Sequence, residues 1–248
     1  MNIVDYLIYE SIEFIKRYAP KDGYVVNFSG GKDSVVLLDL VKKAGVPYKA
    51  VYLNPTIDPP ELVHFVRRAY PEVTIMQPSI PFFKMVQRKG LPTRTLRWCC
   101  NIYKETRGAK LGKHHLLGIR CEESPKRAKR QRISQHQGVT HYYPIFYWRT
   151  IDIWTYIKQN QLPYCKLYDE GFRRLGCVIC PMQNHKEFLR NQKLYPHHFQ
   201  ALKRAFKVFY DNHPAVQERG EFEKLWQYWL KYHMLPGKKY RNIKGGKL

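Results

Sequence analysis

The stretch "NFSGGKDSVVLLDL", residues 27–40, constrains the fold of this chain more than any other feature. The apolar run at 24–28 is typical of a buried strand, and the run at 33–45 has the length of a helix and ends at a glycine. A strand that enters a glycine-rich turn and then a helix forms an anion site, because backbone N–H groups point at the ligand. The glycine spacing fits neither a Walker A loop nor a dinucleotide fingerprint, so the loop predicts another kind of phosphate site.

Apolar and helix-like runs alternate along the first two thirds of the chain. Strands are predicted at 24–28, 48–53, 73–77, 114–119 and 141–145, with helices at 33–45, 59–70 and 150–160. This order predicts an α/β fold with a doubly wound, parallel, five-stranded sheet.

The pattern after about residue 184 is helical and aromatic, and the last stretch is basic without apolar periodicity. We therefore predict three segments: a nucleotide-binding domain at 1–182, a helical C-terminal region at 183–235 and a basic tail at 236–248. In the helical region, Trp226, Tyr228 and Trp229 have the spacing of core residues rather than of a base-stacking surface.

The charge of the chain is strongly positive, with 43 Lys and Arg against 20 Asp and Glu and a net charge of +23. Such an excess favours a polyanionic partner, most simply nucleic acid, over a solvated basic surface without a partner. No apolar run approaches ~18 residues, so no membrane span is predicted. The first twenty residues have the pattern of an amphipathic helix and not of a secretory signal, so we expect a cytoplasmic protein.

The loop "SGGKDS" resembles the pyrophosphate-binding loop of the adenine nucleotide alpha-hydrolase superfamily, whose members cleave ATP between its α and β phosphates. Later stretches resemble the phosphoadenylylsulfate-reductase-like branch of that superfamily: "RWCCNIYKE" at 97–105, "LGIRCEESPKR" at 117–127, "PIFYWRTIDIWTYIKQNQLPY" at 144–164 and "GFRRLGCVICPM" at 171–182. The resemblance covers residues 24–182 in family order. It implies that the nucleotide's phosphates are held by Ser29, Gly30, Gly31, Lys32, Asp33 and Ser34.

The resemblance also implies individual roles in the site. Lys32 would complement the charge of the leaving pyrophosphate, and Asp33 would help to hold Mg²⁺. The end of the second strand, from Leu53 to Thr56, would border the adenine of ATP, although the family often has Asp-Thr where this chain has "NPT". The element implied to reach the reacting phosphate or sulfate contains Gly118, Arg120, Glu123 and Arg127. The alternative for its two arginines is membership of the solvated run "KRAKRQR".

Two cysteine pairs lie far apart in the sequence, Cys99 with Cys100 and Cys177 with Cys180. Four such thiols fit a metal site, and their spacing alone admits either structural zinc or an iron–sulfur cluster. In the branch that the chain resembles this arrangement holds a 4Fe-4S cluster, so the resemblance implies one here. The two remaining cysteines are expected to be small core residues: Cys121 and Cys165.

Three functions are compatible with these features. An APS/PAPS (sulfonucleotide) reductase needs a thiolate nucleophile, which its family carries in a C-terminal Glu-Cys-Gly-Leu-His motif, whereas this chain has no cysteine after Cys180. A non-catalytic basic module is disfavoured by the intact loop. An ATP pyrophosphatase that adenylates nucleic acid, so that sulfur can replace oxygen, accounts for the loop, the cysteines and the charge together.

We favour this third function, in the form of Dnd- or Ssp-type DNA phosphorothioation, with tRNA thiolation as the alternative process and a cysteine desulfurase as the expected sulfur donor. Binding to the polyanion would be driven mainly by its phosphates. The basic residues predicted to contact it are Lys126, Arg127, Lys129, Arg130 and Arg132, with Lys238, Lys239, Arg241 and Lys244 in the tail.

Overall fold

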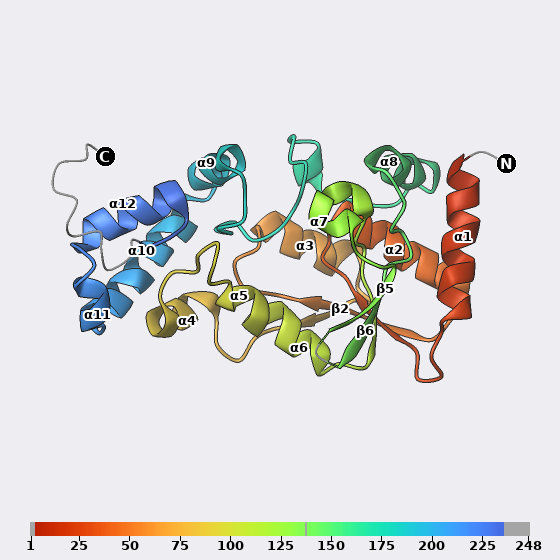
Figure 1. Cartoon of the computed structure of the whole chain (residues 1–248). Coiled ribbons are helices and arrows are strands. Elements are labelled where there is room, and N and C mark those ends of the chain that lie inside the picture. Colours follow the sequence, from red (N-terminus) through yellow and green to blue (C-terminus); the bar gives the residue numbers. More distant parts are fainter. Residues whose placement is uncertain (1–2, 137, 236–248) are drawn as a thin grey trace. The chain divides into compact units, whose positions relative to one another are not determined.

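The apolar run that precedes the loop forms an inner strand of a sheet in the computed structural model, which describes residues 3–136 and 138–235 (Figure 1). Over those residues six strands are hydrogen-bonded in the order β3-β2-β1-β4-β6-β5. All neighbouring strands run parallel except β5, which is antiparallel to β6. The strands are β1 (Tyr24–Asn27), β2 (Tyr48–Leu53), β3 (Thr74–Met76), β4 (His114–Leu116), β5 (Ile133–His136) and β6 (Val139–Tyr142).

The predicted doubly wound α/β fold is confirmed, and the sheet described has one strand more than predicted. The additional strand, β5, reads "ISQH" and carries a single apolar residue, Ile133. It lies at the edge of the sheet, where none of its residues is buried. Since hydrophobic periodicity marks only strands with a buried face, this edge strand had no signal of that kind.

Helices cover both faces of the sheet (Figure 1). One face packs against α1 (Ile3–Arg17), α2 (Lys32–Ala44), α3 (Pro60–Ala69) and α8 (Thr150–Gln159), which share the main apolar core with β1 and β2. The opposite face holds a smaller cluster around Val25, Val51 and Leu53, next to α6 (Thr106–Ala109). The loop between β1 and α2 therefore begins at the carboxyl end of a strand that is buried on both faces.

The described chain divides into two compact units, and neither is continuous in sequence. The first comprises the segments up to 54, 58–77 and 104–176, and the second comprises 55–57, 78–103 and the chain from 177 onward. The predicted boundary at residue 182 lies within the second unit. The remaining helices and helical turns are α4 (Phe82–Lys89), α5 (Trp98–Cys100), η1 (Asn101–Glu105), η2 (Cys121–Glu123), α7 (Pro125–Ala128), η3 (Lys166–Tyr168), α9 (His185–Leu194), α10 (Pro196–Asp211), α11 (Pro214–Gln217) and α12 (Phe222–Tyr232).

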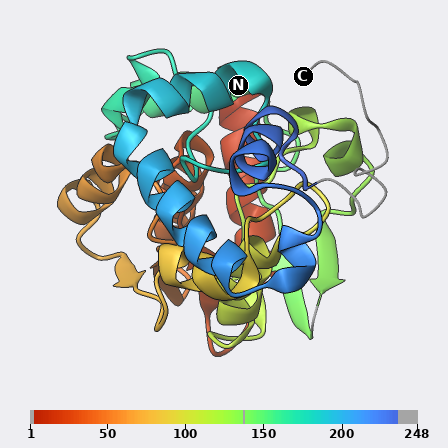
Figure 2. The same ribbon diagram turned by 90° about the vertical axis from the view of Figure 1, so that its left-hand side faces the viewer.

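The second unit is built mainly of helices, with α10 packed against α4 (Figure 2). Trp226 and Trp229 of α12 are buried in it, as predicted for core residues, and the indole N–H of Trp229 donates to the Pro92 carbonyl at 2.7 Å. None of the helices in the described part of the chain combines the length and the apolar character needed to cross a membrane.

Candidate functional site

The glycine-rich loop is closed by a serine hydroxyl rather than by its glycines alone. Ser34 Oγ donates to the Gly31 carbonyl at 2.8 Å and accepts from the Ser29 amide at 3.2 Å. These two bonds tie both ends of the turn to the first turn of α2. No side chain of Gly31 caps α2, so the start of the helix is not covered by its own N-cap residue, although the Ser34 amide is bonded to the Gly31 carbonyl at 3.0 Å.

Gly30 needs the conformational freedom of glycine at this turn. Its φ is +72°, in the left-handed region, and a Cβ added there would lie 2.7 Å from side-chain atoms of Leu62 and Val66. Both of these side chains belong to α3 and are buried. The loop is therefore fixed by packing against α3 as well as by its own hydrogen bonds.

Three charged side chains of the predicted site are bonded to one another. Asp33 accepts at Oδ2 from Lys32 Nζ at 3.0 Å and at Oδ1 from Arg120 Nε at 2.6 Å. Lys32 and Arg120 are buried, with residue exposures of 6% and 2%. Burial works against the charge of Arg120, but the neighbouring carboxylates of Asp33 and Glu122 outweigh it and raise the pKa of the guanidinium. The structure thus brings Lys32, Asp33 and Arg120 into one bonded cluster and keeps the Arg120 guanidinium charged.

Arg120 uses most of its hydrogen-bonding capacity within the protein. Besides Asp33, its N–H groups donate to Glu122 Oε2 at 2.6 Å, to the Trp148 carbonyl at 3.1 Å and to Thr150 Oγ1 at 3.2 Å. A guanidinium has five N–H donors, so these described partners leave one for a ligand. The predicted contact of Arg120 with a phosphate stays a prediction for that single donor.

The acidic residues after Arg120 fix this segment to α8 and to the basic run. Glu122 accepts from the Thr150 amide at 2.7 Å, at the start of α8, and the Thr150 hydroxyl also donates to it. Glu123 accepts from the Arg120 amide at 2.9 Å and is ion-paired with Arg127. The sequence pointed to Glu123 and not to Glu122, because no spacing rule connects Glu122 with a helix that starts 28 residues later.

Gly118 lies where the segment after β4 crosses the start of α2. A Cβ added to Gly118 would lie 3.0 Å from the backbone carbonyl of Asp33. A larger residue would push against the backbone of Asp33. Gly118 therefore lets this segment approach the start of α2 closely, and its predicted contact with the nucleotide stays a prediction.

Two further predicted residues lie at the end of β2 and just after it. Leu53 is 9% exposed at the end of that strand. Thr56 has a φ of +64°, an unusual conformation for a β-branched residue, and its hydroxyl accepts from the Phe82 amide at 2.9 Å at the start of α4. Thr56 belongs to the second unit, and its predicted contact with adenine stays a prediction.

The four predicted metal ligands all belong to the second unit. The pKa of the Cys99 thiol is raised by its hydrogen bond with Cys100, by burial and by the nearness of Cys177 and Cys180. The structure therefore gathers the two distant pairs into one group. In the residues that it describes, no set of three His, Cys, Asp or Glu side chains is placed to hold a single metal ion.

The second unit also fixes the backbone around these thiols. The Gln183 side-chain amide donates to the Cys177 carbonyl at 2.9 Å, and the Asn191 amide donates to the Val178 carbonyl at 3.1 Å. Before the other pair, Trp98 stacks on Phe82 with ring centroids 5.4 Å apart. As expected for a core residue, Cys165 is fully buried. Cys121 is partly exposed.

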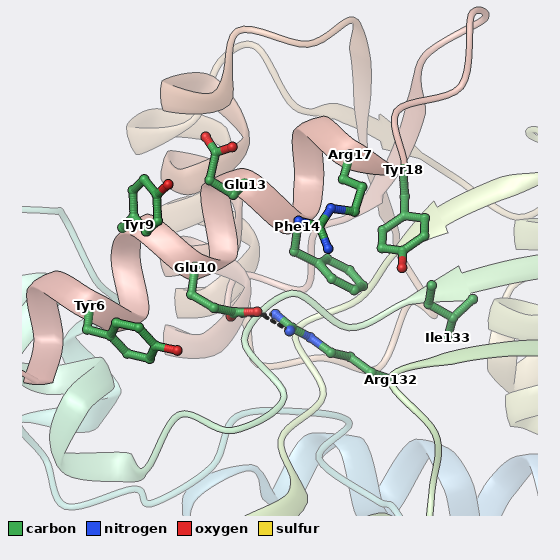
Figure 3. Close-up of a pocket in the computed structure, with 9 residues that line it drawn as sticks. All are labelled: Tyr6, Tyr9, Glu10, Glu13, Phe14, Arg17, Tyr18, Arg132 and Ile133. Atoms are coloured by element: carbon green, nitrogen blue, oxygen red, sulfur yellow. Dashed lines mark hydrogen bonds and ion pairs between the residues drawn. The ribbon is translucent and has the colours of Figure 1, made fainter.

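The basic run predicted to bind nucleic acid is only partly free. Lys126, Lys129 and Arg130 are exposed, whereas Arg127 is paired with Glu123. Arg132 forms a two-pronged ion pair with Glu10 of α1 (Figure 3). The predicted tail residues lie outside the described part of the chain: Lys238, Lys239, Arg241 and Lys244.

The pair of Arg132 and Glu10 lines a pocket of about 500 Å³ at the surface of α1. The guanidinium lies 3.9 Å from the ring centroid of Phe14, and Tyr6 and Tyr9 project from the same helix (Figure 3). None of the phosphate-loop residues lines this pocket. Because Arg132 and Glu10 neutralise each other, Arg132 attaches α1 to the edge of the sheet next to β5.

Comparisons with known proteins agree with this architecture. Residues 23–183 match the family described as the Phosphoadenosine phosphosulfate reductase domain. The chain is 30% identical over 216 residues to an uncharacterised protein of Methanocaldococcus jannaschii, covering 81% of this chain and 53% of that protein. For a second protein of that organism the covered share is 48%, so the chain spans about half the length of these two relatives.

Enzymes are among the other similar proteins. Adenosine 5'-phosphosulfate reductase 2 of Bacillus subtilis is 28% identical over 200 residues, which cover 73% of this chain and 82% of that enzyme. The solved structure of phosphoadenylyl-sulfate reductase from Candida auris aligns with a TM-score of 0.53 at 19% identity, over 70% of this chain and 93% of that one. FMN adenylyltransferase of Candida glabrata aligns with a TM-score of 0.53 at 18% identity, over 70% and 63%. At these identities the two structures show the fold.

Proposed function

The chain belongs to the phosphoadenosine phosphosulfate reductase domain family, and from this premise we propose that it cleaves ATP to AMP and pyrophosphate to activate a nucleic acid for sulfur incorporation. The observation that carries the proposal is the phosphate loop, whose buried Lys32 and Arg120 are bonded to Asp33 at the start of α2. Cationic groups in a site shielded from water stabilise developing negative charge strongly. The negative charge that develops on a leaving pyrophosphate is the kind of charge that this loop would stabilise.

The proposed reaction balances without a redox step. An oxygen of the nucleic acid attacks the α-phosphorus of ATP, and the bond from that phosphorus to the bridging oxygen of pyrophosphate breaks. A sulfur nucleophile then displaces AMP, which leaves with the oxygen of the nucleic acid. Lys32 and the loop amides hold the leaving pyrophosphate, and Asp33 keeps a lone pair on each carboxylate oxygen that Mg²⁺ can share.

A 4Fe-4S cluster is the group that we propose for the four cysteines, because the family resemblance implies one and the structure brings the two cysteine pairs near each other. In a 4Fe-4S cluster each thiolate binds a different iron, so the ligands are spread around the cluster. Cys99, Cys100, Cys177 and Cys180 would hold it, and a bound cluster supplies a reducible iron centre.

The proposed nucleic-acid partner is supported by the net charge of +23 and by exposed basic residues that follow two segments of the site, the one ending at Glu123 and η3. Lys126, Lys129 and Arg130 follow Glu123, and Arg173 and Arg174 follow η3, all of them exposed. We favour DNA over tRNA as the substrate and a cysteine desulfurase as the sulfur donor.

A sulfonucleotide reductase is the second candidate, because the Bacillus subtilis relative carries that name. The reductase reaction needs an accessible thiolate outside the cluster ligands. The 248 residues offer Cys121 and Cys165 for this role, and burial raises the pKa of the Cys165 thiol and keeps it protonated. Within these 248 residues, Cys121 is therefore the thiol that could serve this candidate.

Parallel turnover assays separate the two functions. We expect ATP consumption that duplex DNA or tRNA stimulates, and no sulfite release from adenosine 5'-phosphosulfate with a dithiol reductant. Sulfite release that Cys121→Ser abolishes would establish the reductase instead. If six to eight phosphates are contacted, affinity for the stimulating nucleic acid should fall roughly 10³-fold or more between 50 and 200 mM salt.

A further inference from the structure

A tyrosine from a distant part of the chain reaches the phosphate loop. The backbone N–H of Lys32 donates to the Tyr168 hydroxyl at 2.9 Å, although the two residues are 136 positions apart. Tyr168 ends the short turn η3, and its ring packs edge-on against Trp154 at 5.1 Å and against Tyr164 at 6.5 Å. The hydroxyl is therefore held in place by ring packing that is independent of the loop.

The Tyr168 hydroxyl occupies the anion-binding side of the loop. A Cβ added to Gly31 would lie 3.4 Å from the Tyr168 oxygen, so the hydroxyl sits directly against the second glycine. The Lys32 ammonium lies 5.9 Å from the centroid of the same ring. The amide that Tyr168 engages belongs to the first turn of α2, where orphan N–H groups attract negatively charged oxygen.

The hydroxyl hydrogen of Tyr168 has no acceptor among the residues that the structure describes. Burial raises the pKa of Tyr168, so its hydroxyl stays a neutral O–H at ordinary pH. A phenol can accept one hydrogen bond and donate another at the same time. Here the accepted bond comes from Lys32, and the donor is left for a ligand that carries acceptor oxygens.

We propose that Tyr168 is a phosphate-binding residue of this loop. Its oxygen accepts from the Lys32 amide and its O–H donates to an oxygen of the pyrophosphate end of ATP. The proposal rests on the proposed function, because it takes the loop to hold that pyrophosphate. It adds a neutral donor, contributed by a separate segment of the chain, to the backbone amides and the lysine. The bond forms with pyrophosphate and not with the nucleoside, so its loss should affect only ligands that carry that group.

The test compares two phenol-to-phenyl changes in the same segment. Tyr164→Phe is the matched control: its hydroxyl donates to Asp169 at 2.9 Å and its ring packs on the same Trp154. Calorimetric titration of wild type and both variants with Mg·ATP, inorganic pyrophosphate and adenosine should show Tyr168→Phe weakening ATP and pyrophosphate about tenfold. Adenosine affinity should be unchanged in Tyr168→Phe, and Tyr164→Phe should match wild type for all three ligands.

Three results would overturn the assignment. Unchanged or tighter pyrophosphate binding by Tyr168→Phe would show that the hydroxyl contributes nothing to binding or only blocks an empty loop. Equal weakening of adenosine and pyrophosphate would show a structural role. If wild type binds adenosine but neither ATP nor pyrophosphate, the loop holds no phosphate, and the proposed function fails with the assignment. If the wild type cleaves ATP and Tyr168→Phe binds pyrophosphate as tightly as wild type, the role of Tyr168 is rejected and the proposed function stands.

Discussion

The phosphate loop and the cysteine group differ in how their ionisable side chains are compensated. In the loop, Asp33 is bonded to Lys32 and to Arg120, and its carboxylate helps to raise the pKa of the buried Arg120 guanidinium. In the cysteine group, the Cys99 thiol is kept protonated by its bond with Cys100, by burial and by the other thiols. The charges at the loop are therefore compensated by protein groups, whereas four thiolates can coexist only when a metal centre compensates their charge.

The largest effect should follow from removing one cysteine of the group. Cys177→Ala should reduce the iron of anaerobically purified protein from about four per chain to nearly none, because a cluster needs all its thiolates. Cys165→Ala, at a buried cysteine outside the group, is the control and should keep its iron. Metal analysis and the visible spectrum give the readout. Stoichiometric zinc without iron in the wild type would reject the cluster.

A substitution of Arg120 tests whether charge compensation within the protein stabilises the phosphate loop. Arg120→Met removes the guanidinium that holds Asp33 and Glu122, and it should destabilise the protein by roughly 1.5–3 kcal/mol, because the half-buried Asp33 carboxylate loses one of its two cationic partners. Urea denaturation measures this change. Lys16→Met, at an exposed lysine paired with the exposed Glu13, should move the midpoint little. A stable Arg120→Met protein that has lost only activity would mean that Arg120 serves the ligand and not the scaffold.

Substitutions of Gly30 in the loop and of Gly45 at the end of α2 separate the steric cost of a side chain from the conformational cost of a positive φ. Both have positive φ, +72° and +68°, but a Cβ on Gly30 meets Leu62 and Val66 at 2.7 Å, whereas a Cβ on Gly45 meets nothing within 4 Å. Gly45→Ala should therefore cost about 1 kcal/mol, and Gly30→Ala about 2–3 kcal/mol. Equal losses in urea denaturation would show that α3 does not fix the loop.

Two adjacent histidines, the buried His115 and the half-buried His141, should make stability depend on pH. His115 and His141 lie side by side on β4 and β6, with ring centroids 5.9 Å apart. Burial lowers the pKa of both rings, and for His141 it falls to about 4, with further contributions from His115, His136 and Arg130. Because the folded protein resists protonation that the unfolded chain accepts, stability should be constant above pH 6.5 and should fall between pH 6.5 and 4.

The expected loss for the histidine pair is roughly 1–2 kcal/mol on going from pH 7 to pH 5, since partial exposure reduces the effect. Urea midpoints at the two pH values measure it. His141→Gln should flatten the dependence in that window. A midpoint that does not change with pH in the wild type would contradict the burial of these rings as neutral groups.

The sequence predicted what is contiguous and missed what the fold assembles. The loop from Ser29 to Ser34 was predicted because strand, turn and helix follow one another directly. Tyr168 and Glu122 were missed, because each meets its partner only when segments far apart in the chain pack together. A lone tyrosine or one of two adjacent glutamates gives no local signal of such a contact.

The basic run shows that the sequence also could not distinguish exposed arginines from those paired within the protein. The sequence counts Arg130 and Arg132 as equivalent positive charges. In the fold, Arg130 is exposed and Arg132 is bound to Glu10, which lies 122 positions earlier on α1. Composition predicted the net charge correctly, but it could not tell which arginines had partners within the protein.

The position of the bond that breaks in ATP tests the central claim most directly. The protein is incubated with Mg·ATP and the stimulating nucleic acid, using ATP labelled at the α-phosphate and, in parallel, at the γ-phosphate. Without a sulfur donor, the γ label should appear in pyrophosphate and an equal amount of α label in adenylated nucleic acid together with any released AMP, and Lys32→Ala should lose about 2–4 kcal/mol of transition-state stabilisation. The appearance of labelled ADP with labelled orthophosphate would contradict the central claim.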